Sequence, residues 1–167
     1  DRTIEIAKSK NCIVIESEWR DDFSYSRNIS IEAASGEFIL ALDADERIVN
    51  PQELLDTINR AKPNDGGWLV DLVSSSEIDS KVLQSYSSKI LRLFRRHPNI
   101  RFEGVIHEQI VYNIVKSNFK VLNSKIKILH LGYDLSPEQL RSKQLRKDIP
   151  HQIGKRFIKN YRRKTSH

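Results

Sequence analysis

The first half of the chain alternates short apolar runs with segments of helical spacing. Residues 12–16 (CIVIE) and 38–42 (FILAL) are apolar runs of strand length. Residues 23–35 between them have a helical face that includes Phe23 and Ala34, with Ser24 as the predicted cap and Gly36 as the stop. A further helix is predicted from Pro51, a favoured first residue of a helix, to Lys62, which precedes another proline. Because strands and helices alternate here, the pattern predicts a parallel sheet covered by helices.

The second half has a different pattern, in which apolar and polar residues alternate as in half-exposed strands. Such runs occupy residues 67–75, 85–96 and 124–133. They predict a smaller mixed or antiparallel part, so the expected fold class is α/β with a mostly parallel central sheet and this addition. Residues 74–88 are rich in serine and form either a loop near a site or a surface connector.

Length and composition suit a single globular domain, since the chain has 167 residues of which 38% are apolar and 30% charged. No apolar run approaches the length of a membrane-spanning helix, and the first residues lack the pattern of a secretory leader. The single cysteine, Cys12, cannot form an internal disulfide, and its apolar neighbours predict a buried position. These features predict a cytoplasmic protein.

The net charge of +6 is concentrated at the carboxyl end. Residues 141–167 contain ten Lys or Arg and one acid, Asp148, so the residues before them are mildly acidic. We therefore divide the chain into a body, 1–136, and a basic helical tail, 137–167. The tail is a solvated helical face, a surface that lies on the inner face of an anionic membrane, or a nucleic-acid contact. Apolar residues among the basic ones favour an amphipathic membrane surface and argue against nucleic acid.

Three carboxylates, Asp43, Asp45 and Glu46, follow the apolar run 38–42 within four positions. In open parallel sheets ligands bind outside the carboxyl ends of the strands, and residues two apart in an extended segment face the same way. Asp43 and Asp45 would then repel each other unless a cation or a hydrogen-bonding ligand lies between them. The pattern therefore predicts Mg²⁺ or Mn²⁺ together with a phosphorylated ligand. The simpler alternative is a solvated loop whose aspartates cap a helix.

Three segments in this order resemble the family-2 glycosyltransferases of GT-A fold. They are FSYSRNISIEAASGEFILALDADERI at residues 23–48, LRLFRRHPNIRFEGVIHEQI at residues 91–110 and ILHLGY at residues 128–133. The sugar transferases of cell-wall or lipopolysaccharide-core synthesis are the most similar subgroup, and the resemblance covers about residues 1–145. It implies transfer of a sugar from a nucleotide-diphosphate-sugar donor to a glycan, lipid-linked or cell-envelope acceptor, with inversion at the anomeric carbon.

By position, the resemblance implies roles for five residues. Asp43 would contact the ribose or base of the donor, Asp45 would bind the metal that bridges the diphosphate, and Arg27 would reach the nucleotide. Glu108 would be the catalytic base that takes the proton of the acceptor hydroxyl. His107 beside it would help to hold the acceptor, and the metal would stabilise the departing diphosphate.

His130 and Arg95 are two further candidates. The resemblance places His130 where many GT-A enzymes have another metal ligand, and a neutral imidazole favours Mn²⁺ over Mg²⁺. The alternative is a core histidine between two leucines. Arg95 would bind the phosphates of the donor through bidentate hydrogen bonds. Arg92 and Arg96 share this chemistry, but alternation along a strand places Arg95 and Arg96 on opposite faces.

Members of this family normally begin with a strand, a helix and a second strand before a Gly-Ser-Thr-Asp turn, whose end Asp1, Arg2 and Thr3 resemble. The resemblance therefore predicts an N-terminally truncated domain that lacks part of the donor pocket. An open sheet edge would favour self-association, and full activity is not expected of this chain alone. Asp1 is also predicted to cap the helix that follows it.

Other interpretations remain open from the sequence. Arg27 could pair with Glu32 or Asp22 instead of reaching a nucleotide. Phosphoryl-transfer enzymes also place a D-x-D triplet after a buried strand and use the first aspartate, here Asp43, as nucleophile. Glu46 then stands where those enzymes usually have a small or hydroxyl residue, which argues against this class. A non-catalytic glycan-binding or partner-binding module is the third class.

Overall fold

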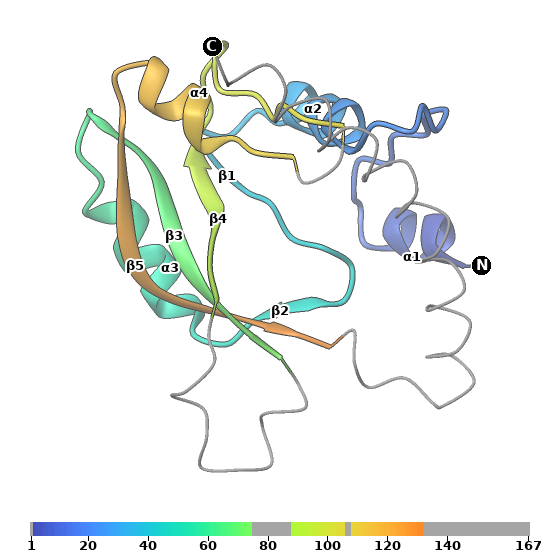
Figure 1. Cartoon of the computed structure of the whole chain (residues 1–167). Coiled ribbons are helices and arrows are strands. Elements are labelled where there is room, and N and C mark those ends of the chain that lie inside the picture. Colours follow the sequence, from blue (N-terminus) through green and yellow to red (C-terminus); the bar gives the residue numbers. More distant parts are fainter. Residues whose placement is uncertain (1, 75–87, 106–107, 132–167) are drawn as a thin grey trace. The chain divides into compact units, whose positions relative to one another are not determined.

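The computed structural model describes residues 2–74, 88–105 and 108–131 (Figure 1). In chain order the elements of these residues are α1 (Thr3–Ser9), α2 (Phe23–Ala33), β1 (Phe38–Leu40), β2 (Glu46–Ile48), α3 (Pro51–Asn59), β3 (Asp65–Ser74), β4 (Ser88–Arg95), α4 (Val111–Lys116) and β5 (Lys120–His130). The predicted helix at Pro51 begins at that residue. No helix in the described ranges is both long and apolar enough to cross a membrane.

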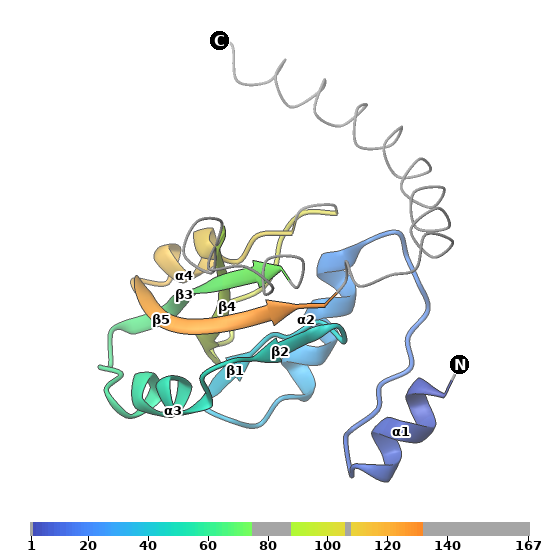
Figure 2. The same cartoon turned by 90° about the horizontal axis from the view of Figure 1, so that it is seen from below.

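The five strands form one sheet in the order β1-β4-β3-β5-β2. β1 pairs antiparallel with β4, with Phe38 opposite Arg95, and β2 pairs antiparallel with β5, with Glu46 opposite His130. Figures 1 and 2 show β3 and its neighbour β5 running in the same direction, and Figure 2 shows β2 beside the end of β5. The predicted α/β fold class, with parallel and antiparallel strands in one sheet, is confirmed.

The chain divides into two compact units. Of the described residues, the first unit contains 2–41, 60–69, 91–105 and 108–123, and the second unit contains 42–59, 70–74, 88–90 and 124–131. The long strands β3, β4 and β5 therefore contribute residues to both units. The predicted boundary at residue 136 and the basic tail lie outside the described residues, so this division stays a prediction.

A buried apolar cluster forms the core of the first unit. Its members are Ile31 of α2, Leu91 and Phe94 of β4, Ile100, Phe102 and Ile110 of the segment after β4, and Ile114 of α4. The rings of Phe94 and Phe102 meet edge to face with their centroids 5.9 Å apart. Burial of one such side chain is worth about 1.5–3 kcal/mol. The cluster therefore fixes the segment after β4 against α2 and β4.

Gly66 of β3 lies directly under α4. A Cβ atom built at this position would lie 2.3 Å from Cβ of Phe119 and 3.0 Å from Cγ2 of Ile114. Ile114 is fully buried, so it has no room to move away. This close approach of backbone to side chains requires glycine here.

The change Gly66→Ala should therefore lower the free energy of unfolding by about 1–3 kcal/mol, the usual cost of overpacking. Urea denaturation followed by circular dichroism would measure the loss. Gly36→Ala is the matched control, because its added Cβ meets only the carbonyl oxygen of Phe38, at 3.3 Å. Equal stabilities of the two variants would contradict the packing described here.

In the second unit, β5 holds the start of α3. The Asn50 side chain donates to the carbonyl of Lys125 at 2.8 Å and accepts from the N–H of Lys127 at 2.8 Å. The N–H of Val49 also donates to the carbonyl of Lys127, at 2.9 Å. These bonds extend the β2–β5 pairing beyond Ile48 and lead the chain into the helix at Pro51.

Residues 12–16 do not form the predicted strand. They have no regular structure, Cys12 is exposed rather than buried, and Ile13 is largely exposed. A strand obtains its hydrogen bonds from neighbouring strands, and none of the five described strands pairs with this run. An apolar run of strand length is therefore not sufficient evidence of a strand.

The helix caps also differ from the prediction. Asp22, not Ser24, caps α2: its side chain accepts from the N–H of Tyr25 at 3.1 Å. Ser24 is instead a buried residue of the helix. At α1 the cap position is taken by Arg2, whose side chain forms no capping bond, and Asp1 lies outside the described residues.

Candidate active site

The three carboxylates after β1 have different surroundings in the second unit. The N–H of Glu46 donates to the carbonyl of Asp43 at 3.0 Å, and the N–H of Asp43 donates to Oε2 of Glu46 at 2.9 Å. Glu46 is buried, while Asp43 and Asp45 are partly exposed. The carboxylate of Glu46 thus has a structural task, which is to close the turn.

Asp43 and Asp45 do not lie at the end of an extended strand, although their sequence pattern predicts that position. Asp43 and Asp45 were expected to face the same way at the end of an extended strand, but β1 ends at Leu40 and residues 43–46 turn. β1 also pairs antiparallel with β4, so the rule for the ends of parallel strands does not place these acids. Their positions come from the turn and from the pairing of β2 with β5.

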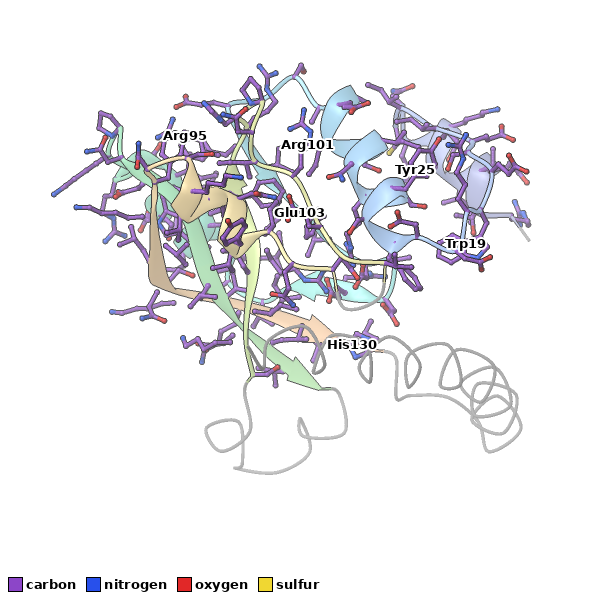
Figure 3. The ribbon with its side chains drawn as sticks, turned by 45° about the horizontal axis from the view of Figure 1, so that its top comes forward. Trp19, Tyr25, Arg95, Arg101, Glu103 and His130 are labelled. Atoms are coloured by element: carbon purple, nitrogen blue, oxygen red, sulfur yellow. The ribbon has the colours of Figure 1, made fainter. Side chains whose placement is uncertain are left out.

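Asp45 and His130 are brought together by that pairing. The register sets Glu46 opposite His130, and the N–H of Leu131 donates to the carbonyl of Asp45 at 2.8 Å. Oδ2 of Asp45 consequently lies 3.3 Å from Nε2 of His130, with side-chain exposures of 43% and 24%. Figure 3 shows His130 at the carboxyl end of β5. A carboxylate and an imidazole, both accessible to solvent, therefore meet at one point.

The donor atoms of this pair fit a divalent cation. Oxygen and nitrogen ligands lie about 2.1 Å from such ions, so adjacent ligands of an octahedral ion are roughly 3 Å apart. The 3.3 Å between Asp45 and His130 is close to that separation. Within the described ranges, no group of three or more His, Cys, Asp or Glu side chains is placed to hold a metal. An ion here would complete its shell with water and phosphate oxygens, as Mg²⁺ commonly does.

Arg27 and Glu108 form an ion pair in the first unit, although 81 positions separate them in the chain. Nε of Arg27 donates to Oε1 of Glu108 at 2.5 Å, and the two side chains are 25% and 16% exposed. The guanidinium carbon of Arg27 also lies 5.5 Å from the ring centroid of Phe102. Arg27 therefore pairs with the predicted base, a partner that the sequence alternatives Glu32 and Asp22 did not include.

Two polar residues of α2 that the sequence argument missed hold the segment before Glu108. Asn28 donates to the carbonyl of Phe102 at 3.0 Å and accepts from its N–H at 2.9 Å. The hydroxyl of Ser24 donates to the carbonyl of Gly104 at 2.6 Å. Ser24, Asn28 and Ile31 follow helical spacing on α2, and that spacing is the signal that could have revealed them.

The backbone around Glu103 continues this support. Glu103 and Gln109 exchange N–H···O bonds of 2.9 and 2.8 Å. These two residues stand on either side of Glu108 in the chain, so their pairing anchors the backbone next to it. On the other side, the amide of Asn113 donates to the carbonyl of Arg101 at 2.9 Å. Figure 3 shows Arg101 and Glu103 on the segment that runs beside α2. The backbone before and after Glu108 is therefore held by hydrogen bonds. The other predicted residue of this segment, His107, lies outside the described residues.

Arg95 has contacts that give it a structural task. Its guanidinium pairs with Glu37, donates to the carbonyls of Asp65 and Lys62 at 3.2 Å each, and lies over the ring of Phe38. Nε of Arg96 donates to the carbonyl of Gly36 at 2.8 Å. The donor-binding role of Arg95 stays a prediction.

Comparison with known proteins places the chain in a family. The family model described as glycosyl transferase family 2 matches residues 1–115, which is more than half of the chain. The chain therefore belongs to glycosyl transferase family 2.

Three curated relatives are informative. A TPR repeat-containing protein of Synechococcus elongatus is 30% identical over 151 residues, which cover 80% of this chain and 33% of the relative. The SPbeta prophage-derived glycosyltransferase SunS of Bacillus subtilis and the glycosyltransferase SunS of Bacillus phage SPbeta are each 29% identical over 154 residues, or 87% of this chain and 34% of theirs. The chain thus spans about a third of the length of the curated relatives it matches.

Proposed function

We propose that the chain carries catalytic residues of a metal-dependent, inverting glycosyltransferase. The family and the SunS relatives support glycosyl transfer in general. The proposed donor is a nucleotide-diphosphate sugar, and the proposed acceptor is a glycan or a lipid-linked molecule of the cell envelope. The observation that carries the proposal is the Arg27–Glu108 pair, which gives a partly exposed carboxylate a fixed position in the family's base segment.

Glu108 is the proposed base. In an inverting transfer the acceptor oxygen forms a bond to the anomeric carbon while the bond from that carbon to the diphosphate breaks. Arg27 holds Oε1 of Glu108, so Oε2 is the atom assigned to receive the hydroxyl proton. The backbone bonds on either side of Glu108 limit its movement, which favours a constant position of the carboxylate relative to the acceptor hydroxyl.

Asp45 and His130 are the proposed ligands of the cation, and Asp43 the contact to the ribose or base. Bound Mg²⁺ or Mn²⁺ would stabilise the negative charge that develops on the leaving diphosphate. Asp45 supplies a negative charge beside the imidazole of His130, and both side chains remain accessible to solvent. The basic residues of 141–167, beyond the described part, are proposed to hold the protein on an anionic membrane surface, at about 1 kcal/mol for each residue near the lipid.

A donor screen tests this function. The full-length protein should release nucleotide diphosphate from at least one UDP-, GDP- or dTDP-sugar, and only when Mn²⁺ or Mg²⁺ is present. Release is measured with a coupled diphosphate assay, before and after treatment with EDTA. Silence with every common donor, or release that EDTA leaves unchanged, would contradict the proposal. A protein that binds glycans but turns over no donor would then be the better description.

A further inference from the structure

Two aromatic rings at the start of α2 form an exposed and ordered surface in the first unit. Trp19 is 53% exposed and Phe23 is 47% exposed, yet their rings meet edge to face with centroids 4.9 Å apart. The indole N–H of Trp19 donates to Oδ1 of Asp21 at 2.9 Å, which fixes the plane of the ring. Figure 3 shows Trp19 on the segment that leads into α2. Large rings that stay exposed while held in place are typical of binding surfaces.

Two charged residues, Arg20 and Asp21, stand between Trp19 and Phe23 in the chain. Asp21 has a left-handed backbone, with φ of 53°, and its carboxylate lies beside Trp19. The guanidinium carbon of Arg20 lies 4.3 Å from the ring centroid of Tyr25. An acyl chain laid on this surface would cover the charges of Arg20 and Asp21 without giving them hydrogen bonds, which is costly. A sugar ring suits the surface better, since its C–H face can pack on the aromatic rings while its hydroxyls bond the charged groups.

The same surface is linked to Glu108 by two separate routes. Phe23 and Arg27 stand four positions apart on α2, so they share a face and are about 6 Å apart along the helix axis. Arg27 in turn binds Glu108. In addition, the N–H of Phe23 donates to the carbonyl of Val105, three positions before Glu108. The rings therefore lie about one helical turn from the residue that holds the base.

We propose that Trp19 and Phe23 form an acceptor subsite that holds a sugar unit next to the one whose hydroxyl attacks. This inference rests on the proposed function, because it assigns Glu108 as the base. It identifies the acceptor as a saccharide of at least two units, or a molecule that ends in one. The subsite would supply affinity for the acceptor and take no part in the proton transfer.

Tryptophan fluorescence can report on this subsite alone. The chain has two tryptophans, and Trp68 is buried, so acrylamide should quench mainly Trp19. The probes are cellohexaose, chitohexaose, maltohexaose and mannohexaose, without any donor. At least one of them should protect Trp19 from quenching in a saturable manner. Phe23→Ala should weaken that binding by at least about fivefold, because half of the ring surface is lost.

The control variant is Tyr112→Ala, which removes a similarly exposed aromatic ring from α4 and should leave the affinity unchanged. The subsite is ruled out if no hexasaccharide protects Trp19, if both variants weaken binding equally, or if only phosphatidylcholine vesicles or a mixture of casein peptides protect it. Protection without donor turnover would count against the proposed function alone. Donor turnover without protection would count against the subsite alone.

Discussion

Replacing Glu108 with glutamine should lower the rate of sugar transfer by about 10²–10⁴-fold, the usual contribution of a positioned general base. The amide oxygen of glutamine can still accept from Nε of Arg27, so the contact that orients the side chain is retained. What is lost is a group that can take a proton. The measurement is kcat for transfer at saturating donor, together with the donor Kd, which should change little because Glu108 is not among the residues proposed to contact the donor.

The control for this variant is Glu103→Gln. Glu103 is an exposed acid on the same folded-back segment, and its link to Gln109 runs through backbone atoms that the substitution does not touch. It should transfer at nearly the wild-type rate. If Glu108→Gln retained more than about a tenth of the activity, another group would have to act as the base.

The elements predicted correctly are those that patterns within a few residues of the chain identify. The proline at position 51 and the stripe that follows it mark α3, and alternation of apolar and polar residues marks β3, β4 and β5. One exception is residues 12–16, an apolar run of strand length that does not form a strand. Strand formation depends on a partner, and the presence of a partner is not a local property of the run.

The sequence indicated which residues belong to the candidate site, but not which of them contact each other. Arg27 and Glu108 are distant in the chain, and only the fold of the segment after β4 brings them together. The three acids after β1 look equivalent in the sequence, but backbone bonds turn Glu46 inward. Polar side chains that bond the backbone, such as that of Asn28, are equally hard to predict, because in sequence they resemble surface residues.

Replacing Asp45 with asparagine should weaken Mn²⁺ binding in the presence of UDP by at least about 100-fold, since changes to residues behind the ligands already cost 10–100-fold. The substitution removes the negative charge beside His130 and keeps the size of the side chain. Because the carbonyl of Asp45, not its side chain, accepts from Leu131, the β2–β5 pairing should persist. Calorimetric titration of Mn²⁺ into the protein with UDP gives the affinity, and denaturation gives the stability.

The variant Glu46→Gln separates this role from that of the neighbouring acid. Glu46 is buried and accepts from the N–H of Asp43, so losing its charge should weaken a charge-assisted bond worth about 1.5–3 kcal/mol. We therefore expect lower stability with little change in Mn²⁺ affinity, the opposite of the result for Asp45→Asn. If the Asp45→Asn variant bound Mn²⁺ normally while the Glu46→Gln variant did not, the cation would have to be assigned to Glu46 and not to the Asp45–His130 pair.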